Sequence, residues 1–266
     1  MRTLLLLGLV CLASPAFAGE TPWQNVAPGV QLRLISSDSK AADGTTLVGL
    51  ELDMPQTYRT YWQIPGETGI PTEIDISGSS GVKDATIDWP YPRPEKLSGY
   101  LDYVYYGPTV LPVTLAATAP SGELKASVVM GVCAEVCVPV QAKFDLPLGF
   151  AATDPGQSIR LAQALSLTPI AWDQPAPPFG ALSYDATVHA LRLALASSAI
   201  DPSSIIASTG DPTLIFDTPQ PAGDGKSVLL PLRDKTRTSD WTKQPVELTF
   251  LTADGSFKVS EPVSRP

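Results

Sequence analysis

Short segments in which apolar and polar residues alternate recur along the first 150 positions of the chain. Val30–Ile35 and Thr46–Leu52 show this pattern most clearly, and a period of two residues puts every second side chain on one face of a β-strand. Segments of similar character follow at Ile74–Ile76, Thr86–Trp89, Leu111–Leu115, Leu124–Met130 and Val140–Leu146. About seven or eight short strands separated by turn residues predict a β-sandwich.

The pattern changes after residue 150. Gln157–Leu167 carries apolar residues at helical spacing behind Asp154 and Pro155, which predicts one short helix. A proline-rich linker follows at Gln174–Phe179. Beyond the linker, strand-like segments return at Ala190–Leu195, Thr213–Phe216, Val228–Leu232 and Val246–Leu251. These segments predict a second, smaller β unit.

Composition agrees with an all-β protein of two domains. The 27 prolines and 20 glycines divide the chain into short pieces, and the length exceeds that of one ordinary sandwich domain. We expect a first domain over residues 19–150, a helix and linker over 151–175, and a second β-sandwich-like domain over 176–266.

The first 18 residues have the features of a signal peptide. Arg2 precedes an apolar run from Leu4 to Leu12, and Ala16-Phe-Ala18 is a small-x-small cleavage site. Cys11 lies inside the run behind Val10, where a lipid-attachment site needs a small residue, so we expect it to be removed with the peptide. No later stretch has the length of an apolar membrane span. The mature chain from Gly19 is therefore expected to be a soluble periplasmic or secreted protein without membrane insertion.

Charge and the inventory of reactive side chains exclude several classes of function. A net charge of −9 and a pI near 4.6 argue against nucleic acid as a partner. His189 is the only histidine, and it is remote in sequence from the cysteines, so neither a catalytic triad nor a zinc site is predicted. We predict no cofactor and no metal. An aromatic run at Tyr100, Tyr103, Tyr105 and Tyr106 is interpreted as strand packing.

Candidate chemistry is concentrated in Cys133 and Cys137, the cysteines that remain after export. In an oxidising compartment such a pair either closes a disulfide or is kept reduced for a purpose. As a structural cross-link it would be weak, since a loop of about five residues removes only about 2 kcal/mol of chain entropy. On a hairpin with Ala134–Val136 as its tip, the pair would form an exposed and reducible disulfide.

The charges near the pair in sequence do not favour a thiolate. Glu135 lies between the cysteines, and the nearest cations are Lys125 and Lys143. Because cations lower thiol pKa values, the pair is expected to attack slowly unless the fold supplies a cation.

Several separated motifs resemble the periplasmic N-terminal domain of the thiol:disulfide interchange protein DsbD, and still more its relative ScsB, the copper-sensitivity suppressor protein. They are Thr60–Pro71, Asp88–Pro92, Gly99-Tyr100, Leu111–Leu115 and Gly131–Pro139, in the family's order. The resemblance runs over roughly residues 24–150, and the second β unit resembles the extra domain of the ScsB type more loosely.

This resemblance implies an immunoglobulin-like sandwich that exchanges thiols and disulfides. Cys137 corresponds to the cysteine that forms mixed disulfides and Cys133 to its resolving partner. Residues 89–99 occupy the place of the family's cap loop, and Tyr91 and Tyr100 are its candidate lid residues. The implied partners are thioredoxin-like periplasmic oxidoreductases or disulfide isomerases, with reducing power from a separately encoded membrane electron carrier.

Two departures from the family leave alternatives open. The family has five residues between its cysteines where this chain has three, and full-length members continue into a membrane carrier and a thioredoxin-like domain. One alternative is a Cu(I)-binding or copper-tolerance protein that uses Cys133, Cys137 and Met130, because soft sulfur ligands select Cu(I). The other is a non-catalytic binding module with a structural disulfide.

Overall fold

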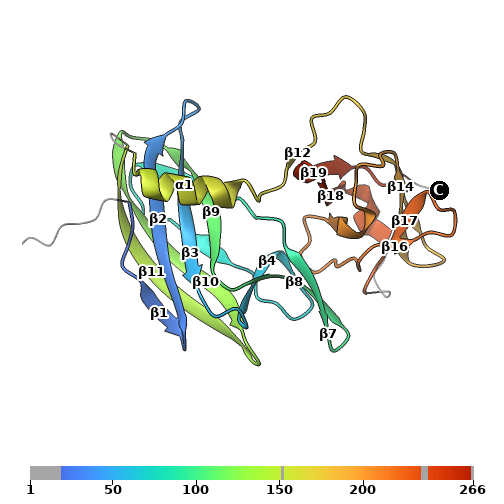
Figure 1. Ribbon diagram of the computed structural model, residues 1–266, viewed down its shortest axis with the longest axis horizontal. Helices are drawn as coiled ribbons and strands as arrows, with labels where there is room; N and C mark the ends of the chain where they lie inside the picture. The colour runs from blue at the N-terminus through green and yellow to red at the C-terminus, as the bar shows by residue number, and fades with distance from the viewer. Residues whose placement is uncertain (1–18, 151–152, 235–238, 265–266) are drawn as a thin grey trace, which may run out of the picture.

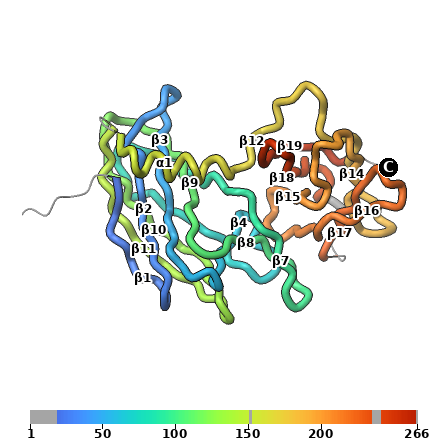
Figure 2. Tube along the Cα trace, viewed as in Figure 1, coloured from blue at the N-terminus to red at the C-terminus, as the bar shows by residue number. Residues whose placement is uncertain are grey.

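The computed structural model describes residues 19–150, 153–234 and 239–264, which form two β-sandwich units (Figure 1). The predicted signal peptide lies outside the described residues. Figure 2 shows the two units side by side, with the chain passing once from the first to the second. Within the described part of the chain, no helix has the length and apolar character that crossing a membrane requires.

The first unit packs two antiparallel sheets face to face. One sheet has the order β1 (Gln24–Ala27), β2 (Val30–Lys40), β3 (Thr45–Asp53), β9 (Thr109–Ala117), β6 (Val82–Ile87). The other has the order β11 (Cys137–Gly149), β10 (Ser121–Cys133), β4 (Arg59–Gly66), β8 (Tyr100–Tyr106), β7 (Arg93–Leu97), with β5 (Glu73–Asp75) beside β10. Alternate residues of both sheets, such as Leu50 and Val128, are buried between them.

The second unit repeats this plan with shorter strands. Its sheets have the orders β12 (Ile170–Ala171), β19 (Gly255–Glu261), β18 (Val246–Thr252), β15 (Ile206–Ser208) and β13 (Phe179–Asp185), β14 (Ala190–Leu195), β17 (Ser227–Pro231), β16 (Gln220–Pro221). Two 3-10 turns, Pro202–Ser204 and Ser239–Lys243, complete it. Phe250 contacts Phe179, Phe257 and Trp172 at its centre.

Helix α1 (Pro155–Leu165) covers the outer face of the first sheet (Figure 1). The Asp154 side chain accepts hydrogen bonds from the backbone N–H groups of Gly156 and Gln157, and this cap explains why the helix begins here rather than at Gln157. A Cβ added to Gly49 would lie 2.7 Å from Leu161 Cδ2. The glycine therefore lets the helix approach the sheet closely.

Strands β4, β8 and β7 extend the second sheet to the region between the two units (Figures 1 and 2). Trp62 and Leu101 on one face of this extension pack with Ile206 and Ile215 of the second unit. Tyr61 and Val104, which follow the opposite alternation, pack with Cys133. The extension is thus buried on both faces, with the cysteine on one side and the second unit on the other.

These observations confirm the predicted all-β class of an immunoglobulin-like sandwich followed by a smaller β unit. The predicted strand at Thr213–Phe216 is wrong, since only Phe216 forms a bridge, to Leu232. The Asp211 carboxylate accepts hydrogen bonds from the backbone and hydroxyl of Thr213, and this local turn replaces strand pairing.

Candidate functional site

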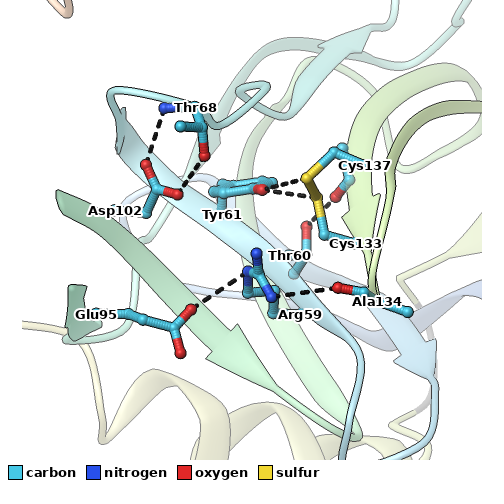
Figure 3. Close-up of a disulfide and its surroundings, with 10 residues drawn as sticks. Arg59, Thr60, Tyr61, Thr68, Glu95, Asp102, Cys133, Ala134 and Cys137 are labelled. Carbon is cyan, nitrogen blue, oxygen red and sulfur yellow. Dashed lines mark hydrogen bonds and ion pairs between the residues drawn. A yellow bond between two sulfur atoms is a disulfide. The ribbon is translucent and has the colours of Figure 1, made fainter. Parts of the chain in front are cut away.

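The site is built on the β10–β11 hairpin of the first unit. The two strands pair without interruption from Ser121 opposite Gly149 to Cys133 opposite Cys137. Ala134–Val136 forms the turn, so this register places the cysteines face to face at the last pair before it. They are joined by a disulfide (Figure 3).

The two cysteines of the disulfide differ in their exposure to solvent. Cys133 is fully buried, whereas Cys137 is half-buried beside an exposed turn. Val136 and Val138 on either side of Cys137 are 74% and 40% exposed. A macromolecular thiol approaching from solvent therefore reaches Cys137 first and meets an apolar surface around it.

Tyr61 of β4 is the polar neighbour of the disulfide. Its Oη lies 2.6 Å from Cys133 Sγ and 3.1 Å from Cys137 Sγ (Figure 3). Burial raises the pKa of the Tyr61 hydroxyl above its usual value, and the nearby Asp102 carboxylate adds to the shift. The phenol is therefore protonated at neutral pH and can donate a hydrogen bond to either sulfur.

Arg59 supplies a cation that the sequence did not indicate. It pairs in register with Cys133 across β4 and β10, and its Nη1 lies 3.5 Å from the carbonyl oxygen of Ala134 in the turn. The lysines nearest in sequence do not take this place; Lys125, for example, pairs with Glu123 and Asp145. The prediction of slow attack held only if the fold supplied no cation, and strand pairing brings Arg59 to the site although it is remote in sequence.

Glu95 of β7 partly neutralises this cation. Its Oε2 lies 3.3 Å from Arg59 Nε, yet the two atoms are not aligned for a hydrogen bond and both are buried without a hydrogen-bond partner. Glu95 also accepts a hydrogen bond from the hydroxyl of Tyr106, which is opposite Arg59 in β8. The guanidinium thus lies between the disulfide and a carboxylate held in imperfect geometry (Figure 3).

The two predicted lid tyrosines are Tyr91, just before β7, and Tyr100, at the start of β8. Tyr91 donates a hydrogen bond to the Ser204 carbonyl of the second unit, and its burial raises its pKa. Tyr100 is 53% exposed at the start of β8, about 20 Å along the strand from Tyr106 at the usual rise per residue. Among the described contacts, the disulfide packs with Tyr61, Val104 and Tyr106, not with Tyr91 or Tyr100. Their role as a lid stays a prediction.

The residues considered for copper are not gathered in one place. Met130 is fully buried in the core between the sheets, whereas Cys133, three positions along β10, packs on the other face with Tyr61. Among the described residues, no group of three or more His, Cys, Asp or Glu side chains is arranged to hold a metal. His189 lies in the β13–β14 turn beside Tyr184.

Arg59, Tyr61 and Glu95 were missed as site residues in the sequence. Tyr61 lies in the motif Thr60–Pro71 and Arg59 immediately precedes that motif, so their spacing of two residues places them on one face of a strand. That signal identifies a shared face but not what the face contacts. The contact depends on the single pairing of β4 with β10 at Cys133.

Fold and site together define a class: a β-sandwich that presents a disulfide at the tip of a hairpin. Residues 31–149 match the family model of the thiol:disulfide interchange protein DsbD, N-terminal. This segment includes both cysteines and all strands from β3 to β11, so the similarity to this family covers the whole disulfide hairpin. The resemblance predicted from the sequence motifs is confirmed.

The N-terminal periplasmic domain of ScsB from Proteus mirabilis has a similar structure. The TM-score is 0.70 at 21% sequence identity, and the match covers 94% of this chain and 100% of that chain. The similarity therefore extends to the fold of the second unit. A search of curated proteins finds no match to this sequence.

Proposed function

We propose that the protein is a periplasmic relay that passes electrons between thioredoxin-like proteins through Cys133 and Cys137. The observation that carries the proposal is the asymmetry of the disulfide, with Cys137 half-buried at the hairpin tip and Cys133 fully buried against Tyr61. The match of residues 31–149 to the DsbD N-terminal family model supports thiol:disulfide interchange as the chemistry.

The accessible sulfur of Cys137 is the point of attack. A thiolate of the donor forms a new S–S bond with Cys137 Sγ, and the bond between Cys137 and Cys133 breaks with its electron pair remaining on Cys133. The Tyr61 hydroxyl, 2.6 Å from this sulfur, donates a hydrogen bond to the developing thiolate. Hydrogen bonds to charged sulfur or oxygen are stronger than neutral ones, so Tyr61 stabilises this leaving group.

A second exchange completes the transfer. The donor's other thiolate attacks the donor sulfur of the mixed disulfide and releases Cys137 as a thiolate. The donor is then oxidised to a disulfide, and the pair in this chain has gained two electrons and takes up two protons. The reduced pair then reduces an acceptor protein. The Cys137 thiolate attacks the disulfide of the acceptor, and Cys133 attacks Cys137 in the resulting mixed disulfide and releases the reduced acceptor.

Trapping variants test the assignment of roles. Cys133→Ala leaves Cys137 as a lone accessible thiol. It should accumulate a mixed disulfide with a thioredoxin-like protein whose single active-site cysteine is joined in a disulfide to a small aromatic thiol, because the Cys137 thiolate attacks the protein sulfur and the aromatic thiolate leaves. Cys137→Ala leaves only the buried Cys133 and should trap at least about tenfold less, since thiol exchange requires access to the sulfur. Mass spectrometry of the non-reduced complex measures both. Equal trapping by the two variants would refute the assignment.

The redox potential of the pair separates a relay from a structural cross-link. An exchanging disulfide should equilibrate with glutathione or with a thioredoxin-like protein, whereas structural disulfides have potentials below about −300 mV. A potential in that lower range would favour the binding-module alternative. The copper alternative has less support, because Met130 and Cys133 face opposite sides of β10.

A further inference from the structure

Strand β7 contacts the second unit with one side chain and the disulfide site with the next. Lys96 Nζ lies 2.7 Å from Asp217 Oδ1 of the second unit. The preceding residue, Glu95, lies 3.3 Å from Arg59 Nε on the disulfide side. Successive side chains of a strand point to opposite faces, so Glu95 and Lys96 contact different parts of the molecule. Because they are adjacent in one strand, a movement of β7 changes both contacts.

Arg233 of the second unit links Asp217, the partner of Lys96, to the β7–β8 turn. Its guanidinium donates to Asp217 at 3.0 Å, to Glu67 at 2.6 Å, and to the carbonyl oxygen of Gly99 in the β7–β8 turn. Glu67 also accepts a hydrogen bond from the Leu101 backbone N–H at the start of β8. Arg233 is thus attached to the turn directly at Gly99 and, through Glu67, to Leu101 just after it.

The charges of this network are matched and partly shielded from solvent. The Asp217 and Arg233 side chains are 14% and 23% exposed. Burial acts to raise the pKa of Asp217, but the hydrogen bonds from Lys96 and Arg233 outweigh it, so its pKa is lowered. Asp217 therefore stays ionised at neutral pH and holds Lys96 and Arg233 together.

We propose that Arg233 and Asp217 are positioning residues for disulfide exchange, which hold the β7–β8 hairpin so that Glu95 stays beside Arg59. The proposal rests on the exchange function proposed above and assigns to the second unit a part in controlling it. With the hairpin held, the Glu95 carboxylate offsets the charge of Arg59, which is the register partner of Cys133. When the hairpin is released, Arg59 acts on the sulfur thiolates unopposed.

The direction of the effect follows from charge. An attacking thiolate is an anion, so it is repelled by Glu95 and attracted by Arg59. Arg59 also favours the ionised form of a cysteine thiol after reduction, because a nearby cation lowers the thiol pKa. Release of the hairpin should therefore speed reduction of the disulfide and lower the thiol pKa of the reduced pair.

Arg233→Ala tests the proposal in the full mature chain. Dithiothreitol in excess reduces the disulfide without any protein partner, so the measurement stands even if the trapping experiment fails. We expect the rate constant to rise about threefold to tenfold, as for a change of one charge near the reacting atoms. The thiolate absorbance of the reduced protein, titrated with pH, should show a lower thiol pKa. General loosening of the fold would speed reduction without that second change.

Two further variants show whether Arg233 acts through Glu95. Glu95→Gln should reproduce both changes, and Arg233→Ala should add little in the Glu95→Gln background. Arg192→Ala is the matched control, because Arg192 pairs with Asp224 inside the second unit and away from the hairpin. If Arg233→Ala does not fold, Lys96→Ala takes its place. This substitution removes the contact of β7 with Asp217 at a half-exposed side chain. An unchanged rate and thiol pKa in a folded variant, or fully additive effects with Glu95→Gln, would overturn the proposal.

Discussion

A single tyrosine distinguishes the two sulfurs of this disulfide. Tyr61 Oη is 0.5 Å closer to the buried Cys133 sulfur than to Cys137, from the distances of 2.6 and 3.1 Å. The closer sulfur is the one that must leave when Cys137 is attacked. At the scale of residues, the structure therefore combines access at one sulfur with a hydrogen-bond donor at the other.

Tyr61→Phe should slow reduction of the disulfide by dithiothreitol about tenfold. The substitution keeps the ring but removes the donor, and a hydrogen bond to a charged group contributes on the order of 1.5 kcal/mol. The ratio of wild-type to variant rates should stay constant from about pH 6 to about pH 9, because the raised pKa keeps the phenol protonated there. Stopped-flow measurement of the reduction gives both results.

Tyr105→Phe is the control for this prediction. Tyr105 lies in the same sheet extension and donates a hydrogen bond at 2.6 Å to the Pro90 carbonyl, not to sulfur. It should lose similar stability without a change in rate. A similar slowing in both variants would mean that Tyr61 acts only through packing.

The cysteine pair could be found from sequence, whereas its surroundings could not. Cys133 and Cys137 are identified by export and spacing alone. Arg59 lies more than seventy positions from them, and its place beside the pair is fixed by one register contact between β4 and β10. Hydrophobic alternation predicts that a strand exists and which residues share a face, but it carries no information on which strand becomes the neighbour.

At the scale of elements, helix α1 packs closely on the sheet because the strand position beneath it is a glycine. Gly49 lies in β3 where Leu161 of α1 crosses the strand. Sequence periodicity predicted the helix, although two residues late, since the Asp154 cap includes Pro155 and Gly156 in the first turn. It could not predict that Gly49 allows the close approach of α1, because a glycine in a strand can equally indicate a β-bulge.

Gly49→Ala should destabilise the protein by about 1–3 kcal/mol, the usual cost of overpacking a core. The added Cβ would lie 2.7 Å from Leu161 Cδ2 and 3.0 Å from Val110 Cγ1. Chemical denaturation measures the loss. In Gly49→Ala/Leu161→Ala the helix contact is relieved, so the combined loss should be smaller than the sum of the two single losses.

Gly210→Ala is the comparison for Gly49→Ala, because no atom lies within 4 Å of the position that its Cβ would take. This substitution should leave stability nearly unchanged. Strict additivity of the Gly49 and Leu161 variants would show that the two sites do not meet.

The aromatic run of β8 shows why strand packing was right as a prediction but incomplete. Tyr103 packs toward the second unit and meets Trp62 edge-on. Tyr106 follows the other alternation and packs with the cysteines. Both faces of β8 are buried, so its sequence does not alternate clearly between apolar and polar residues. The sequence therefore indicates strand packing but not that one face contacts the second unit and the other the cysteines.

At the scale of the whole molecule, the second unit contacts the extension rather than the sandwich core. Ile206 and Ile215 cover Trp62 and Leu101, and the Arg233 backbone N–H donates a hydrogen bond to the Ile215 carbonyl at this apolar contact. The predicted split into two β units follows from composition and the proline-rich linker. That the second unit would pack behind the disulfide site follows from long-range contacts, which the linker sequence does not specify.

A fragment ending at Thr168 tests what the second unit contributes. It keeps α1, and Leu167 and Thr168 still bind the first unit through Tyr91 and Asp88. We expect it to fold with its disulfide closed but to lose stability, because Trp62 and Leu101 become exposed. Dithiothreitol should reduce it at least as fast as Arg233→Ala, since both proposed positioning residues, Arg233 and Asp217, are removed.

A shorter fragment that ends at Gly149 separates the two contributions. It lacks α1 as well, so it leaves the face around Gly49 uncovered and should be less stable than the fragment ending at Thr168. Its rate of reduction should nevertheless be similar, because the interactions of Tyr61 with the sulfurs and of Glu95 with Arg59 and Tyr106 do not involve residues of α1. Denaturation and reduction of the two fragments and the full mature chain give the comparison. A Thr168 fragment that matches the full chain in both stability and rate would show that the second unit neither supports the extension nor controls the disulfide.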